Sequence, residues 1–149
     1  MKDLLVREDN LKIIERIRKV TRDSKPLWGK MDAAGMLFHL QVPIRVSIGE
    51  LSPKQSLIGR LFGKMALKEA LSDKPFRKGV PTSNEFKPNS SFDLETEKEK
   101  LIILVSSLVN MGPSALGKNP HPFFGVLTPE EWNILTWKHL DHHLTQFGV

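Results

Sequence analysis

The amino-acid sequence predicts an all-α protein, a four-helix bundle with a long crossover and a small additional helix. Apolar residues recur at helical spacing in long segments, and no stretch alternates apolar and polar residues as a half-buried strand would. One segment rich in proline and glycine is long enough to connect two helices that run parallel. The chain of 149 residues is expected to fold as one domain, residues 1–149, whose core needs no disulfide or structural metal.

The first three expected helices each have their own boundary signals. The first covers residues 8–22, where apolar positions share one stripe, and it ends before Pro26. The second covers 32–49, with apolar residues at i+3 and i+4 and Gly49 as a C-cap. The third covers 56–71 and contains two glycines, which are poor helix formers, so we expect this helix to be shorter than its pattern.

The crossover and two long helices complete the chain. Prolines and glycines within 72–92 exclude a regular element there, so this segment is the predicted crossover. In the helix expected at 94–111, glutamates lie near the positive helix end and apolar residues form a broad face. The last helix covers 129–147 and has the clearest start, because Thr128 and Glu131 form a capping box around a proline.

Composition excludes several kinds of site and partner. With no cysteine, the chain has no disulfide and no thiolate nucleophile, and any metal site must use nitrogen and oxygen ligands. No apolar run reaches roughly 18 residues and no signal-peptide core is present, so we expect a cytoplasmic protein without a membrane partner. The net charge of +5 is concentrated between Lys54 and Lys78 without stacking aromatics, which favours a solvated surface over nucleic-acid binding.

The histidines are the most informative feature of the sequence. Of five in total, four follow residue 120, and the full set is His39, His121, His139, His142 and His143. At about 100° per residue, His139 and His143 lie about 40° apart on the inner face of the last helix, and His142 lies about 60° to the other side of His139. Such a pair can converge on one metal ion. The alternative is two partly buried histidines that are hydrogen-bonded to carbonyls or carboxylates.

His39 is the candidate for a third ligand. It lies on the side of the second helix opposite Gln41 and Arg45 and should be buried. Three buried imidazoles are difficult to satisfy except by a metal ion or an extensive polar network. His121 and His142 are candidate acid or base groups, or hydrogen-bond partners of a metal ligand, although His121 can equally be a loop histidine packed on its neighbours.

Five short motifs are spread over the chain. They are W-G-K-M at 28–31, M-L-F-H-L at 36–40, H-P-F-F-G at 121–125, L-T-P-E-E-W at 127–132 and H-L-D-H-H-L-T-Q-F-G at 139–148. The set resembles the DinB/YfiT-like superfamily and, more narrowly, a bacterial branch of unknown function. This resemblance implies a four-helix bundle with a long crossover and a divalent metal ion held by His39, His139 and His143. Many members have H-H-R-G-Q where this chain has H-H-L-T-Q, so the arginine and glycine are missing here.

The resemblance also implies a class of activity. Characterised relatives include thiol-cofactor-dependent transferases, a maleylpyruvate isomerase and hydrolases, and many are dimers. We therefore expect a metal-dependent transferase or hydrolase for a small-molecule substrate, with zinc or nickel as the metal, a thiol cofactor as one option and a homodimer as one expected assembly. The alternative is a non-catalytic helical bundle, a dimeric stress-related or binding protein whose histidine cluster is vacant or structural.

Overall fold

The computed structural model describes residues 2–80 and 91–149, and this part of the chain is helical, which confirms the predicted all-α class. Each predicted helix is present with slightly different ends. The elements are α1 (Arg7–Lys19), α2 (Ala33–Ser47), α3 (Leu57–Ala70), α4 (Leu94–Met111), the short 3-10 helix η2 (Pro113–Ala115) and α5 (Pro129–Gln146). No described helix combines the length and the apolarity that a membrane crossing requires.

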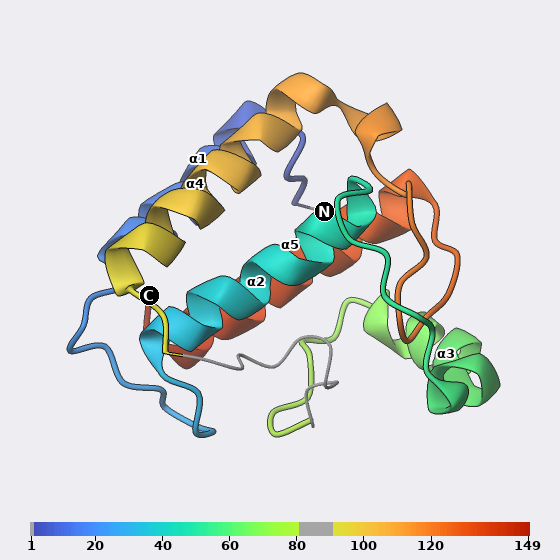
Figure 1. Cartoon of the computed structure of the whole chain (residues 1–149), viewed down its shortest axis with the longest axis horizontal. Coiled ribbons are helices and arrows are strands. Elements are labelled where there is room, and N and C mark those ends of the chain that lie inside the picture. The colour runs from blue at the N-terminus through green and yellow to red at the C-terminus, as the bar shows by residue number, and fades with distance from the viewer. Residues whose placement is uncertain (1, 81–90) are drawn as a thin grey trace.

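The four long helices form two layered pairs. In Figure 1, α1 lies beside α4 along one side of the molecule and α2 lies beside α5 along the other, while α3 projects away from both pairs. Helices α2 and α4 pack on each other and run in the same direction, so the chain between them must return across the bundle. The described part of the predicted crossover, residues 72–80 and 91–92, contains no helix, and residues 81–90 lie outside the described residues.

Capping explains where the helices begin and end. Asp32 accepts a hydrogen bond from the Gly35 amide at 2.7 Å and starts α2, and the predicted capping box of Thr128 and Glu131 starts α5. Helix α1 ends at Lys19, before the predicted end, because Val20 adopts an extended backbone conformation and its side chain is buried in the core.

The two glycines of α3 do not interrupt that helix, which is one residue shorter at each end than the predicted range 56–71. Helix α3 runs through Gly59 and Gly63, with Ser56 as its N-cap. A Cβ atom at either glycine would lie 2.4 Å from the carbonyl oxygen of Phe123. The glycines therefore let α3 approach the loop at 121–125, and this packing offsets their low helix propensity.

Buried polar side chains tie the helices together inside an otherwise apolar core. The Asn10 amide of α1 donates to the carbonyl oxygens of Leu4 and Val105, both at 2.8 Å. The Gln41 amide of α2 donates to the carboxylate of Glu97 on α4 at 2.7 Å. Each of these buried groups has a hydrogen-bond partner, so its desolvation is compensated. These hydrogen bonds therefore favour one arrangement of the helices.

Candidate metal centre

Three histidines from two helices meet in the interior. His39 comes from α2, and His139 and His143 come from α5; we call them the triad. One nitrogen from each ring lies within 4.8 Å of the others, and Nε2 of His39 is 2.7 Å from Nε2 of His139. The sequence placed these rings on facing surfaces, and the structure brings them together as a group that could hold a metal ion.

Local sequence accounts for the position of each ring. The i,i+4 spacing on α5 puts His139 and His143 on the same face, and the buried side chains of Leu140 and Leu144 hold that side of the helix in the core. His39 is buried on α2, which packs on α5. His139 and His143 are half-buried.

Burial keeps the rings of His139 and His143 uncharged near neutral pH. It lowers the pKa of His139 well below its usual value, and the nearby rings of His39 and His143 would repel a further positive charge. Burial likewise lowers the pKa of His143 to about 3. Neutral imidazoles have a free lone pair on one nitrogen, which is the state that a metal cation requires.

Gln146 determines which nitrogen of His143 is free. The Nε2 amide of Gln146 donates to the carbonyl oxygen of Trp28 at 2.5 Å, so its Oε1 faces His143 Nδ1 at 2.7 Å. An amide oxygen only accepts, so Nδ1 must carry the proton and Nε2 is left with its lone pair. The role of Gln146 was not predicted from the sequence, because its partner Trp28 lies far away in the chain.

The donor set and its surroundings fit a divalent transition metal. Imidazole nitrogens suit zinc and nickel, and the three nitrogens that lie within 4.8 Å of one another could hold one such ion. The described part of the chain adds no fourth histidine or carboxylate to the cluster, so three protein ligands would leave a coordination position for substrate or water. On the same face of α5, Trp132 Nε1 and Thr136 Oγ1 are buried and have no hydrogen-bond partner among the described residues. Water or a substrate group would satisfy them.

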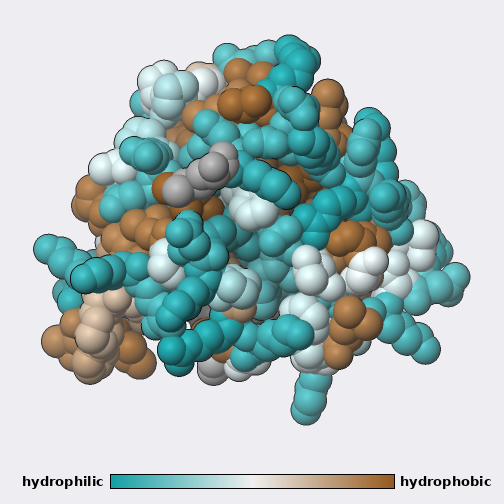
Figure 2. Space-filling model, turned by 180° about the vertical axis from the view of Figure 1, so that it is seen from behind, coloured by the Kyte–Doolittle hydropathy of each residue, from teal (hydrophilic) through white to brown (hydrophobic). Residues whose placement is uncertain are grey.

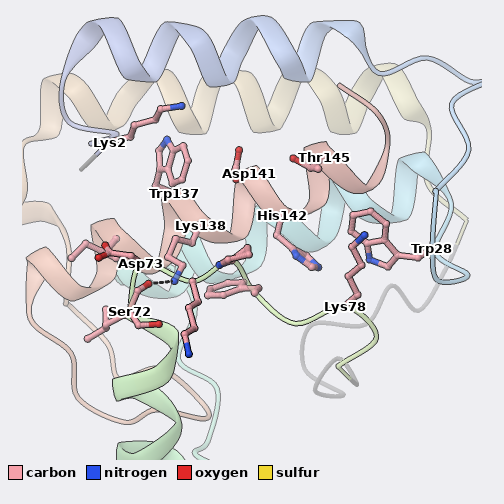
Figure 3. Close-up of a pocket in the computed structure, with 15 residues that line it drawn as sticks. Lys2, Trp28, Ser72, Asp73, Lys78, Trp137, Lys138, Asp141, His142 and Thr145 are labelled. Carbon is pink, nitrogen blue, oxygen red and sulfur yellow. Dashed lines mark hydrogen bonds between the residues drawn. The ribbon is translucent and has the colours of Figure 1, made fainter.

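His142 lies beside the triad but faces a different space. Its ring contacts that of His143 edge-on, with centroids 5.0 Å apart, and packs against Trp28 and Phe76. It lines a pocket of about 370 Å³ along α5, in which Figure 3 shows its ring beside Trp28 and Lys78. Burial lowers the pKa of His142. The predicted role of His142 as an acid, a base or a ligand partner stays a prediction.

The pocket combines aromatic walls with cations. The ammonium group of Lys78 lies 4.1 Å from the centre of the Trp28 ring, and that of Lys2 lies 5.1 Å from Trp137. Lys138 donates to the carbonyl oxygen of Ser72, as the dashed line in Figure 3 marks. The carboxylate of Asp141, also in the pocket lining, is 2.6 Å from Arg16. The pocket therefore favours a ligand with negative charge and a flat apolar part.

His121 organises the loop before α5. Its Nδ1 accepts hydrogen bonds from the amides of Phe123 at 3.1 Å and Phe124 at 3.2 Å, and its ring packs on Trp132. Its backbone exchanges two hydrogen bonds with Gly125. This arrangement supports the packed-loop interpretation. A catalytic role of His121 stays a prediction.

A family comparison agrees with the extent of this single helical unit. The family model described as "Protein of unknown function (DUF1569)" matches residues 2–148. The chain belongs to the DUF1569 family. No match was found among curated proteins or solved structures. The triad, Gln146 and the pocket of this DUF1569 protein are therefore the observations on which a functional proposal depends.

Proposed function

We propose that this DUF1569 protein is a metal-dependent enzyme of the DinB/YfiT-like type that transfers or hydrolyses a group of a small molecule. The observation that carries the proposal is the triad: three imidazoles from two helices converge without a fourth histidine or carboxylate in the described chain. A divalent ion held there, zinc or nickel, would polarise a substrate group or activate water or a substrate thiol. A homodimer, a thiol cofactor and a cytoplasmic location belong to the same proposal.

The protein groups around the triad have separable tasks in this proposal. Gln146 holds the proton of His143 on Nδ1 and so keeps Nε2 available as a ligand. The pocket beside His142 would bind the part of the substrate away from the reacting group, and its lysines favour a carboxylate or phosphate there.

Metal uptake tests the proposal directly. Protein purified without a histidine tag and stripped with a chelator should bind about one zinc or nickel ion per chain in a calorimetric titration. His139→Ala and His143→Ala should each weaken that binding by more than about 100-fold, because losing a ligand costs more than losing a ligand's hydrogen-bond partner.

His142→Ala is the matched control, since this neighbouring ring contacts His143 but does not belong to the triad. It should leave metal uptake within a few-fold of the wild-type value. Absence of uptake by the wild-type protein, or an equal loss in the His142 and His143 variants, would contradict the proposed centre and favour a non-catalytic helical bundle.

A further inference from the structure

Helix α3 exposes a continuous apolar surface. Leu57, Leu61 and Met65 are 76%, 78% and 71% exposed, and Ile58 and Phe62 add 64% and 51%. At about 100° per residue these five side chains occupy one face of the helix. We call this set the α3 face. The brown patch at the lower left of Figure 2 lies at the position of α3. A large exposed apolar patch of this kind is more often an interaction site than a surface without a function.

The α3 face is held outward by the way the helix is attached. The opposite side of α3 carries Gly59 and Gly63, which pack on the backbone of Phe123. The helix is also anchored at both ends. The Ser56 amide donates to the carbonyl oxygen of Pro122 at 2.9 Å, and Lys138 Nζ donates to the carbonyl oxygen of Ala70 at 2.6 Å. The apolar side is therefore the free side of a fixed helix.

Positive charge follows one edge of this face. Arg60, Lys64 and Lys68 are exposed and recur every four residues, so they form a row that borders the apolar side chains and enters the α3 face at Lys68. The acidic side chain of α3, Glu69, is 2.7 Å from Arg77 and is neutralised by it. An exposed apolar face with a basic edge is the pattern of helices that lie in the interface of an anionic bilayer.

We propose that α3 docks this protein on an anionic lipid surface, with the α3 face entering the interface and the basic row contacting lipid phosphates. The helix would lie in the plane of the membrane and would not cross it. The sequence expectation of no membrane partner considered only spanning segments and signal peptides. Association with a membrane surface through α3 differs from that expectation.

Charge argues against a second copy of the chain as the occupant. In an antiparallel pair of α3 helices, each basic row would face the same row of the other copy, and these like charges repel. In a parallel pair the row would face Glu69, which Arg77 already neutralises. A nucleic acid would satisfy the basic row but would leave the apolar side chains in water. A lipid surface satisfies both parts of the pattern.

Vesicle flotation tests this proposal with the full chain. The wild-type protein should float with vesicles of phosphatidylcholine and phosphatidylglycerol in equal parts, should not float with phosphatidylcholine alone, and should be released as salt is raised. The double variant Leu61→Ser/Met65→Ser should bind at least about tenfold more weakly, since it removes two large apolar side chains from the contact. Lys64→Glu should weaken binding several-fold.

Two control variants distinguish binding through the α3 face from nonspecific apolar or electrostatic binding to vesicles. Ile103→Ser removes a 60% exposed apolar side chain of α4, and Lys19→Glu reverses an exposed charge of α1; both should bind like the wild type. Absence of flotation with anionic vesicles would overturn the proposal. A dimer in sedimentation experiments that Leu61→Ser/Met65→Ser dissociates would also overturn it, because the α3 face would then be occupied by a second copy.

Discussion

Gln146 connects the backbone of one loop to the chemistry of a candidate ligand. Its amide group has a donor end and an acceptor end, and the Trp28 carbonyl oxygen accepts from the donor end. The acceptor end, Oε1, accepts a hydrogen bond from the protonated Nδ1 of His143. A partner that fixes the protonated nitrogen of a ligating histidine contributes to metal affinity almost as directly as the ligand does.

Replacement of Gln146 should therefore lower the affinity of the protein for a metal ion. We expect Gln146→Leu to weaken zinc binding by about 10–100-fold, because nothing then holds the His143 proton on Nδ1. Competition with a chromophoric chelator measures the change. Gln146→Glu keeps an acceptor for that proton but cannot donate to Trp28, so it should lower the unfolding temperature while keeping affinity closer to the wild type. Equal losses of affinity in the two variants would exclude this role for the Nδ1 partner.

Helix α3 shows tertiary packing overriding local propensity. Gly63 costs the helix roughly 1 kcal/mol relative to alanine in an exposed position. The structure requires a residue without a Cβ atom at this position, because a Cβ there would lie 2.4 Å from the Phe123 carbonyl oxygen. The obstacle is backbone, which cannot turn aside as a flexible side chain can.

Gly63→Ala should consequently separate helix stability from helix docking. We expect faster amide hydrogen exchange in α3 and a loss of about 1–3 kcal/mol of global stability, although alanine is the better helix former. Lys64→Ala is the control, since it changes the adjacent exposed residue without touching the loop. A stabilised Gly63→Ala protein would show that the loop moves aside and that the close approach is not required.

For the whole molecule, the buried imidazoles link folding to pH. The pKa of His121 is lowered to about 4 by burial, and those of His139 and His143 are lowered by burial as well. Below a pH of about 6.5 the unfolded chain binds protons at these rings that the folded chain does not, so stability falls as pH decreases. Above that pH both states are neutral and the effect vanishes.

His121→Asn should reduce this dependence on pH. An asparagine oxygen can accept the amides that His121 Nδ1 accepts, but it does not titrate. The wild-type protein should lose up to about 3 kcal/mol more than the variant between pH 6.5 and 4, as followed by urea unfolding at each pH. Identical pH profiles for the two proteins would mean that His121 is already charged or exposed in the folded state.

Much of this molecule could be predicted from sequence because periodicity is a local signal. The helix ranges followed from apolar spacing and caps, and the triad followed from the i,i+4 pair on α5 and the inward position of His39. The role of Gln146 and the outward face of α3 could not be predicted. Both depend on loop backbone, at Trp28 and Phe123, that approaches only when the bundle is assembled.

The contact between Gln146 and the loop at Trp28 has an evolutionary consequence. Gly29 follows Trp28 with a φ of 82°, and a Cβ on it would lie 2.9 Å from the amide nitrogen of Gln146. A side chain at position 29 would be strained by this φ and would also displace the Gln146 amide, which would change the hydrogen bond to the candidate ligand at 143. We expect these positions, distant in the chain, to be inherited together as one unit.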